Sequence, residues 1–446
     1  MWTKLMLPLV LTALTGCTLA PPSATPAPPR APAAQPLSAR VIAVGIPGAG
    51  AVSPVGQFRA GGPIRDKPAF AAYTEPGKVL DAGRILVTST SNFGLPRARE
   101  DQAAGAVLSI DPRGSDPLII PPTFAAGGGQ ANALAGRVQL FTAQNAAFVN
   151  GLTKPGAATA DQPAVSSPLS ISINNAFGRI WFANAPLGTA GVGTETIIDP
   201  DGRPLADAPN DRAGGVFAGS LTNRDEQRLP GALSSAGVGN AFLGRSPDGS
   251  TKAVFAVVAA DGSVVQIHSQ KGLDGLAPAG TIHAVPSRTG MVFNWTPDRI
   301  LFIADPTANS LVALNITDDG TVFRGEGVRR LEAPELAMPV DVAAAIPETA
   351  NPDFSSNTTL AGGSDLYVAN RGTGTLVRMR QDGKVVAVRT VQVPGLGDLG
   401  ADRLNGIAVA PDASRLWLTL SSGLPGYADA VGAVLEVPAF NGAGTP

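Results

Sequence analysis

The chain has 446 residues, and its 33 Lys and Arg nearly balance its 35 Asp and Glu. Glycine and proline, with 53 and 40 residues, make up about a fifth of the chain, and only 15% of all residues are charged. This composition argues against helical bundles, coiled coils and doubly wound α/β enzymes, and it favours many short strands joined by turns. The near-neutral charge argues against nucleic acid as a partner, because neutralising phosphates requires a clustered basic surface.

The first 16 residues have the pattern of a signal peptide. Lys4 precedes an apolar run, Leu5–Leu11, which is too short to span a bilayer. The next residues, Leu14-Thr15-Gly16-Cys17, resemble the lipobox of bacterial lipoproteins. That resemblance implies that Cys17 becomes the mature N-terminus and carries lipid, including palmitate, so that the chain has the membrane as a partner. The alternative is an ordinary cleaved signal peptide with a free Cys17.

The residue after the cysteine is Thr18 rather than Asp. In the sorting of Gram-negative lipoproteins this favours the outer membrane, on its periplasmic face or at the cell surface. Residues 17–38 are rich in Pro and Ala and cannot build a core, so we expect an extended tether. At about 3.1 Å per residue the tether would reach roughly 60 Å from the membrane.

The body of the chain, residues 39–441, repeats a strand pattern, and residues 442–446 are expected to be a flexible tail. Each repeat has a first strand, a turn, and a second strand that often begins with Arg and continues with three apolar residues. The six copies of the second strand are Arg84–Val87, Arg179–Phe182, Ala253–Ala256, Arg299–Phe302, Asp365–Val368 and Arg415–Leu418. Asp-Gly pairs between strands, such as Asp382-Gly383, are typical of tight hairpin turns.

Such units cannot bury their faces alone, so the pattern predicts an all-β protein, a β-propeller of four-stranded blades. Six copies favour six blades, closed by the N-terminal strand Arg40–Val44, which has no partner nearby in the sequence. Seven blades are the alternative, with Gly136–Phe141 as a further second strand. In the six-bladed interpretation, residues 141–152 are expected to form a short loop helix.

Segments such as Asn175–Asn184 and Asp298–Asp305 resemble the six-bladed NHL-repeat and gluconolactonase-like propellers. The resemblance implies that ligands bind at one mouth of the central channel. Polar residues at the strand ends are the candidates for this site: Asn92, Asn184, Asn294, Asp305, Asp341, Asn370 and Asn405. Within this set, Asp305, Asn184, Asn370 and Asn405 are the candidate metal ligands, because carboxylate and amide oxygens suit a divalent cation such as Ca²⁺.

The same Asn and Asp residues have a structural interpretation, in which they cap strand ends and bond to turn amides. The resemblance to gluconolactonase-like enzymes implies a metal held by a Glu, an Asn and an Asp, but no blade here offers an acidic residue in place of that Glu. The glycine-rich Gly395–Gly400 fits a nucleotide-binding pattern but precedes a strand rather than a helix, so we expect a loop. The chain has one Cys and two His, and it lacks the G-x-S-x-G, H-E-x-x-H and Walker sequences.

The sequence therefore favours a lipid-anchored cell-envelope propeller that acts as a binding scaffold for a small ligand or for an envelope or extracellular protein. The alternative is a metal-dependent lactonase-like hydrolase that works at the channel mouth. The absence of a complete catalytic motif favours the scaffold, and the predicted ring of polar oxygens favours the hydrolase.

Overall fold

The chain divides into two units, Met1–Ala33 and Ala34–Pro446. The computed structural model describes residues 36–56, 76–89, 106–121, 134, 136–143, 168–174, 179–187, 192–198, 216–220, 238–245, 251–258, 263–268, 277–281, 290–294, 300–316, 323–347, 363–427 and 431–441. Strands dominate these ranges, which contain no α-helix. Accordingly, no helix in the described ranges has the length and apolar character of a membrane span.

The described strands form six sheets that follow one another along the chain. Sheet 1 contains β3 (Ala49–Pro54), β4 (Ile85–Ser89), β5 (Ala106–Ile110) and β7 (Val138–Ala143). Sheet 2 contains β8 (Pro168–Asn174), β9 (Arg179–Leu187), β10 (Val192–Ile198) and β11 (Val216–Ser220). Sheet 3 contains β12 (Val238–Arg245), β13 (Thr251–Val258), β14 (Ser263–His268) and β15 (Ala277–Thr281).

Sheet 4 contains β16 (Met291–Asn294), β17 (Ile300–Asp305), β18 (Ser310–Ile316) and β19 (Phe323–Glu332). Sheet 5 contains β20 (Pro339–Ala344), β21 (Leu366–Asn370), β22 (Thr375–Met379) and β23 (Val385–Val393), with the two-residue strands β1 (Leu37–Ser38) and β24 (Gly397–Asp398) beside β23. Sheet 6 contains β25 (Leu404–Val409), β26 (Arg415–Leu420), β27 (Ala433–Pro438), β2 (Arg40–Val44) and β6 (Leu118–Ile119).

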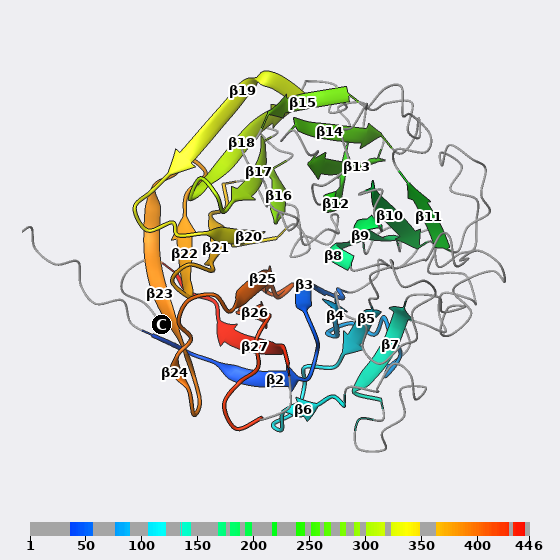
Figure 1. Cartoon of the computed structure of the whole chain (residues 1–446), viewed down its shortest axis with the longest axis vertical. Coiled ribbons are helices and arrows are strands. Elements are labelled where there is room, and N and C mark those ends of the chain that lie inside the picture. The colour runs from blue at the N-terminus through cyan, green and yellow to red at the C-terminus, as the bar shows by residue number, and fades with distance from the viewer. Residues whose placement is uncertain are drawn as a thin grey trace, which may run out of the picture. The chain divides into compact units, whose positions relative to one another are not determined.

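The first strands of the six sheets face one another. Each contacts the first strand of the next sheet, in the order β3, β8, β12, β16, β20 and β25, and β25 contacts β3. Figure 1 shows these strands around a common centre, with the later strands of each sheet farther out. The arrangement is of the propeller type, in which one sheet packs face to face against the next.

Hydrophobic clusters fill the spaces between neighbouring sheets. Sheets 5 and 6 share a cluster that includes Tyr367, Leu418 and Leu435, and sheets 6 and 1 share one that includes Val87 and Trp417. A third cluster joins sheets 4 and 5 through residues such as Phe302 and Val368. Each fully buried aliphatic or aromatic side chain stabilises the fold by about 1.5–3 kcal/mol, so the inter-sheet seams hold the molecule together.

The predicted second strands are confirmed as β4, β9, β13, β17, β21 and β26, each the second strand of its sheet. The turn at Asp382-Gly383 is also confirmed: Gly383 has a φ of 95° and the turn joins β22 to β23. Gly395–Gly400 forms the predicted loop, and its residues 397–398 are strand β24 beside β23.

The predicted helix over residues 141–152 is wrong at its start. Residues 141–143 belong to β7, because pairing with β5 provides partners for the backbone N–H and C=O groups of this segment; residues 144–152 lie outside the described ranges. The same pairing makes β7 the fourth strand of sheet 1 rather than a second strand of a separate sheet.

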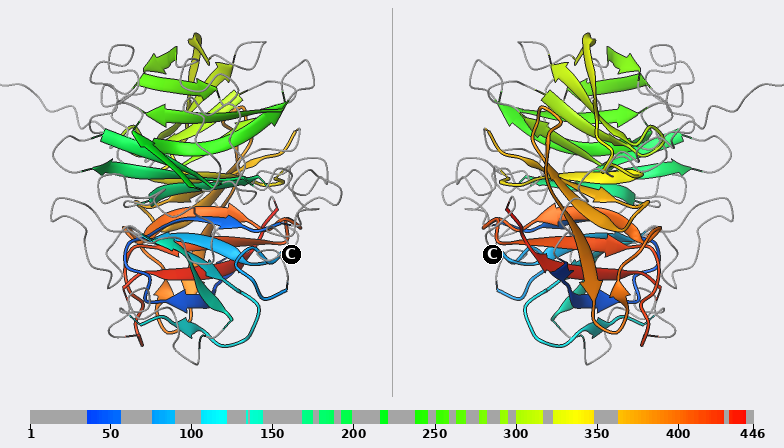
Figure 2. Two further views of the ribbon diagram at one scale, coloured as in Figure 1. Left: turned by 90° about the vertical axis from the view of Figure 1, so that its right-hand side faces the viewer. Right: turned by 90° about the vertical axis from the view of Figure 1, so that its left-hand side faces the viewer.

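The N-terminal segment joins two sheets that lie far along the chain. Strand β2 runs antiparallel to β27, with Arg40 opposite Glu436, and β1 runs parallel to β23. Figure 2 shows β2, in blue, beside the C-terminal strands in red and orange. Arg40 donates to the Glu436 carboxylate at 3.0 Å, which ties the first described strands to the last.

Candidate functional site

One end of the first strands gathers most of the predicted site residues. In each sheet the first strand begins where the antiparallel second strand ends: Pro339 lies opposite Asn370, and Pro168 lies opposite Asn184. We call this end the mouth. Asp305 and Asn370 end second strands there, and Asn184 lies within β9 opposite Pro168, the first residue of β8. Asp341 and Asn405 lie near the starts of first strands.

Two predicted residues do not join this group. Asn294 is the last residue of β16 and pairs with Ile300, so it lies at the opposite end of its strand from the mouth. Asn92 lies outside the described residues, as does Cys17. Asn184 is placed by its strand backbone in β9.

Asp305 is fully buried, and both its carboxylate oxygens have protein partners. Oδ1 accepts the backbone N–H of Ala308 at 3.1 Å, which closes the turn after β17. Oδ2 accepts Nη1 of Arg330 at 2.9 Å, and the same nitrogen donates to Ser310 Oγ. A cation at Asp305 would have to displace a guanidinium, so these contacts match the structural interpretation of this residue.

Asn370 is buried in the same manner at the end of β21. Its Nδ2 donates to the carbonyl of Glu335 at 2.6 Å, and its Oδ1 accepts the N–H of Ala337 at 3.3 Å. The side chain thereby fixes the connection that leads from β19 into β20. Its amide oxygen is used by the backbone, as expected for a residue that caps a turn.

Asp341 lies on β20 and reaches two neighbouring sheets. Its Oδ1 accepts the N–H of Val342 at 2.8 Å, and its Oδ2 accepts the N–H of Ile407 on β25 at 2.9 Å. A Cβ at Gly290, just before β16, would lie 1.8 Å from Asp341 Oδ1. A Cβ at Gly406 would lie 3.4 Å from Oδ2. The absence of side chains at these two glycines makes room for the carboxyl group.

Burial raises the pKa of Asp341 from 3.8 to about 7, although the hydrogen bonds from Ile407 and Val342 oppose the increase.

A β-bulge precedes Asp341 on β20 and precedes Gly406 on β25. The extra residue of a bulge redirects the side chains that follow it. Asp341 and Gly406 therefore occupy the same position in their sheets, and only Asp341 fills it with a carboxyl group.

Asn405 connects three sheets at the mouth. Its Nδ2 donates to the carbonyl of Ala49 on β3 at 2.6 Å, which fixes the orientation of the amide. Its Oδ1 then accepts Nη1 of Arg371 at 3.3 Å. Beside it, the hydroxyl of Thr419 donates to the carbonyl of Gly50 on β3. The Asn405 oxygen faces a cationic side chain, which disfavours a metal ion at this atom.

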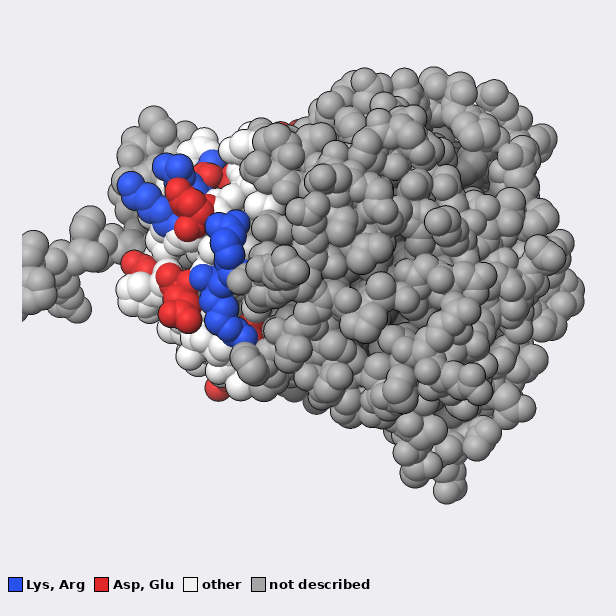
Figure 3. All heavy atoms as spheres, turned by 90° about the horizontal axis from the view of Figure 1, so that it is seen from above, with Lys and Arg blue, Asp and Glu red and all other residues white. Residues whose placement is uncertain are grey.

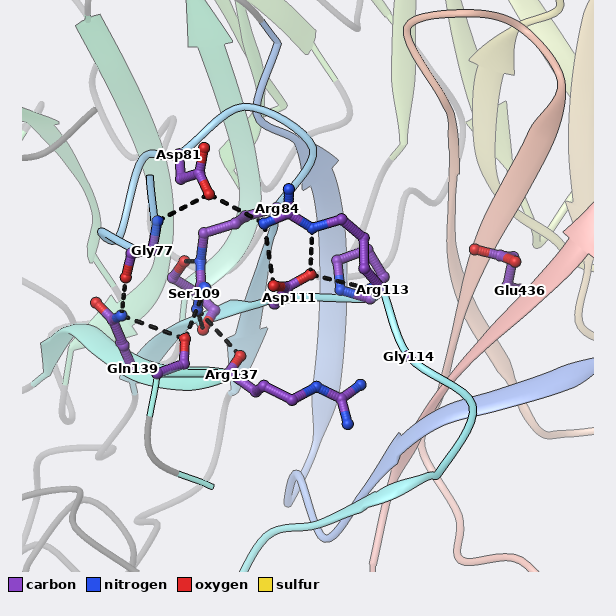
Figure 4. A network of polar contacts seen from close by, with 12 residues as sticks. Gly77, Asp81, Arg84, Ser109, Asp111, Arg113, Gly114, Arg137, Gln139 and Glu436 are labelled. Carbon is purple, nitrogen blue, oxygen red and sulfur yellow. Dashed lines mark hydrogen bonds and ion pairs between the residues drawn. The ribbon is translucent and has the colours of Figure 1, made fainter. Parts of the chain in front are cut away.

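A second polar cluster, around Arg84, lies in sheet 1 (Figure 4). The fully buried Arg84 donates to the side chain and carbonyl of Ser109 at 2.7 and 2.9 Å, and to the carbonyls of Gly136 and Arg137 at 2.8 and 3.0 Å. Burial lowers the pKa of Arg84 to about 10, with Asp111 and Asp81 opposing the change. These contacts tie strands together and use four of the five N–H donors of the buried guanidinium.

Arg113 joins the two acidic residues at the rim of this cluster. It contacts Asp111 at 2.7 Å and Asp81 at 3.0 Å. Burial alone would raise the pKa of Asp111, but hydrogen bonds from Arg113 lower it overall. Hydrogen bonds to Asp111 and Asp81 in turn raise the pKa of Arg113. The cluster is electrostatically balanced and has the character of a structural network.

Within the described part of the chain, no three His, Cys, Asp or Glu side chains come together as a metal site would require.

Trp417 is buried in the core between sheets 6 and 1, and its indole N–H donates to Glu436 at 3.2 Å, as expected of a packing residue. Figure 3, a view of the molecule from above, shows Lys and Arg beside Asp and Glu on the described part of the surface it presents. Charges of both signs are interspersed there.

Sequence reasoning missed Arg371, Gly290 and Gly406. Arg371 sits in the turn Arg-Gly-Thr-Gly after β21, and no pattern distinguishes it from other surface arginines. The two glycines are significant only because Asp341, which is distant in the sequence, fills the space beside them.

No known protein family matches the chain, and no curated protein sequence matches it. Several solved structures are similar over most of its length. A luciferin-regenerating enzyme has a TM-score of 0.40 at 9% identity and covers 89% of this chain and 95% of its own. A calcium-binding regucalcin from Agrobacterium tumefaciens has a TM-score of 0.38 at 13% identity and covers 90% and 98%.

An auxiliary nutrient binding protein from Bacteroides thetaiotaomicron has a TM-score of 0.45 at 9% identity and covers 89% of this chain and 70% of its own. These three proteins are described as one enzyme and two binding proteins. Their low identities transfer no activity, ligand or site residue to this chain.

Proposed function

We propose that the protein is a lipid-anchored cell-envelope propeller that acts as a binding scaffold for a small ligand or a partner protein. The proposal rests on one observation: the polar side chains at the mouth are hydrogen-bonded to the protein itself. Asp305 and Asn370 hold turns, and the Asn405 oxygen holds Arg371. The mouth thus presents a rigid, hydrogen-bonded rim, with the positive charge of Arg371 where a metal-dependent hydrolase would need a cation.

The proposed architecture has six blades and is closed by the N-terminal strand. Six sheets in the described ranges, with one first strand each, support this number. The pairing of β2 with β27 supports the closure, because it covers an edge of sheet 6 that would otherwise be open. The Cys17 anchor and the tether of residues 17–38 would hold the propeller near the outer membrane.

The lactonase-like hydrolase is the second candidate, and one observation favours it. Asp341 and Asn405 lie on adjacent first strands near the mouth, and a carboxyl group with a pKa of about 7 suits proton transfer near neutral pH. In that function a divalent cation such as Ca²⁺ would be needed to polarise the lactone carbonyl.

Thermal unfolding with added metals separates the two candidates. The lipid-free protein beginning at Thr18 is treated with a chelator and then with Ca²⁺, Mg²⁺, Mn²⁺ or Zn²⁺. A metal that binds only the native state at a hundredfold excess over its Kd would add about 2.7 kcal/mol of stability. The scaffold proposal expects no change in the midpoint and no lactone hydrolysis. A shift that is abolished in Asn405→Ala, together with hydrolysis, would favour the enzyme.

Partner binding is tested by shortening the connection between β7 and β8. A deletion of residues 124–166 would remove β7 itself, so the suitable variant replaces only residues 144–166 with a short Gly-Ser linker. Long connections in compact domains are commonly functional. We expect cross-linking to an envelope partner to be lost while the unfolding midpoint is unchanged. A matched variant that shortens 348–362 is the control, and unchanged cross-linking in the 144–166 variant would count against this surface.

A further inference from the structure

Arg371 lies at the mouth, immediately after the last residue of β21. Its backbone N–H donates to the carbonyl of Met338 at 3.0 Å, and its carbonyl accepts the N–H of Asp402 at 2.8 Å. The backbone is therefore held on one side by the connection before β20 and on the other by the connection before β25. A side chain on such a fixed backbone loses little further freedom when it binds a ligand.

The guanidinium of Arg371 is oriented by a chain of two hydrogen bonds. Its Nη1 donates to Asn405 Oδ1 at 3.3 Å, and Asn405 Nδ2 donates to the Ala49 carbonyl at 2.6 Å. Because the Ala49 carbonyl can only accept, the amide nitrogen must face it and the amide oxygen must face Arg371. The guanidinium is thus positioned by a neutral group, and no carboxylate of the described residues pairs with its charge.

Three arginines on the described sheets differ in this respect, because each pairs with a carboxylate. Arg330 pairs with Asp305 at 2.9 Å, Arg378 with Asp365 at 2.8 Å and Arg40 with Glu436 at 3.0 Å. Among the described residues, no carboxylate lies within ion-pair distance of Arg371. Arg371 is half-buried, and within the described ranges its Nε and Nη2 have no hydrogen-bond partner.

An exposed apolar residue, Met338, is joined to Arg371 through a backbone hydrogen bond. Met338 is 42% exposed and has a left-handed φ of 47°, which is unusual for a residue with a long side chain. Its N–H donates to Asn309 Oδ1 at 2.8 Å, and Asn309 also has a positive φ, of 51°. Strained backbone of this kind is concentrated at binding and active sites. The strain here presents a methionine at the mouth, beside the backbone of Arg371.

We propose that Arg371 and Met338 form a binding site for a small carboxylate with a short apolar chain. The planar guanidinium offers two parallel N–H donors, which match the two oxygens of a carboxylate. The thioether of Met338 offers an adaptable apolar contact for the chain of the ligand. This inference rests on the proposed scaffold function and specifies the class of ligand that the mouth takes.

The test is calorimetric titration of the full chain in detergent at low salt. Hexanoate is the probe, and hexanamide, which has the same chain without the negative charge, is the control ligand. We expect hexanoate to bind at least tenfold more tightly than hexanamide. Arg371→Gln should weaken hexanoate binding at least tenfold, and Arg371→Lys should weaken it less. Met338→Ala should weaken hexanoate binding but leave acetate binding unchanged.

Arg403→Gln is the matched control. Arg403 is a second arginine at this end of the sheets, but its Nη1 donates to Ser422 Oγ and the Gly423 carbonyl rather than to Asn405. The control should bind hexanoate like the unmodified chain, and all variants should keep the unfolding midpoint. If Arg403→Gln lost as much hexanoate affinity as Arg371→Gln, the binding would be diffuse electrostatic attraction, and the proposal would be overturned.

Two further outcomes would also overturn it: undiminished hexanoate binding by Arg371→Gln, or no hexanoate binding by the unmodified chain. The scaffold proposal is judged separately, because the cross-linking experiment changes only residues 144–166 and keeps Arg371. If cross-linking persists while hexanoate fails to bind, only the carboxylate site is refuted. If both fail, the scaffold proposal fails with it.

Discussion

The carboxyl group of Asp341 is partly protonated near neutral pH, because its pKa of about 7 lies far above that of an exposed Asp. The cause is tertiary: the inner strands of sheets 4, 5 and 6 exclude water from it, and Gly290 and Gly406 let them approach. No neighbour within the described ranges offers the carboxylate a cation. Two backbone N–H groups are its partners, and they only partly compensate for burial.

The native state therefore binds a proton at Asp341 that the unfolded chain has already released above about pH 4. The stabilisation from this proton is complete below about pH 4 and is lost as the pH rises through about 7. We expect the free energy of unfolding to fall across this window by a few kcal/mol. Urea unfolding at pH 4.5, 6 and 8 measures the change, and Asp341→Asn should flatten it.

Asp412→Asn provides the control of opposite sign. Although burial alone would raise the pKa of Asp412, hydrogen bonds from Ser414 lower it overall, so its stabilising effect is lost as the pH falls. This variant should retain the loss of stability between pH 4.5 and 8. A pH dependence in Asp341→Asn as steep as in the unmodified protein would show that another group titrates.

At the scale of the element, one buried cation, Arg84, joins three strands at one end of sheet 1. Arg84 precedes β4 and bonds to Ser109 at the end of β5 and to the carbonyls of Gly136 and Arg137 before β7, so it joins three strands at one end. In the sequence, the Arg that begins several second strands was only a marker of where those strands start. In the structure, the side chain of Arg84 donates hydrogen bonds to carbonyls of neighbouring strands at the point where the backbone pairing of these strands ends.

Arg84→Met should destabilise the protein by about 3 kcal/mol, because it leaves several buried oxygens without donors. Chemical unfolding measures this difference directly. Arg415→Met is the matched variant: Arg415 also begins a second strand, but its side chain is 43% exposed and its ion pairs are longer, at 3.6 and 3.8 Å. Its loss should cost at most about 1 kcal/mol. Equal effects of the two substitutions would contradict the structural role of Arg84.

At the scale of the whole molecule, the N-terminal segment links sheets 5 and 6. Strands β1 and β2 pair with β23 and β27, and the Arg40–Glu436 ion pair reinforces the second pairing. A chain that begins at residue 36 keeps these pairings, whereas one that begins at residue 46 leaves two strand edges open. Open edges are sites of aggregation.

We expect removal of residues 1–35 to leave the thermal midpoint unchanged. Removal of residues 1–45 should lower it by more than about 5 °C or abolish soluble expression. The reason is that it removes the buried side chains of β2, each of which contributes about 1.5–3 kcal/mol, and each kcal/mol shifts the midpoint of a domain of this size by about 1 °C. Size-exclusion chromatography and thermal unfolding of both truncated proteins measure the outcome. Equal midpoints would contradict the closure.

The lipid anchor is tested on the intact chain. Cys17→Ser should release the protein from the membrane fraction and prevent incorporation of labelled palmitate, because acyl chains contribute about 0.8 kcal/mol per buried methylene and one protein surface does not replace them. Fractionation and labelling of cells that express each form measure both effects. Membrane association that persists in Cys17→Ser would indicate another mode of attachment.

Much of the fold followed from local pattern. Apolar runs bounded by turn residues located all six second strands, and the Asp382-Gly383 turn followed from the need for a positive φ. The helix expected over residues 141–152 was wrong where it can be examined, because pairing with β5 outweighed the weak local signal of this segment. Local patterns locate strands reliably when both faces of each strand are buried.

The candidate site depended on contacts that no local pattern contains. The sequence by itself determined that the chain is an all-β repeat protein with polar residues at its strand ends. Only the tertiary structure decided that Asp305 and Asn370 hold turns, that glycines from two other sheets surround Asp341, and that Asn405 orients Arg371. The reason is physical: strand formation depends on residues a few positions apart, whereas burial, pKa and charge compensation depend on neighbours that the fold brings from distant parts of the chain.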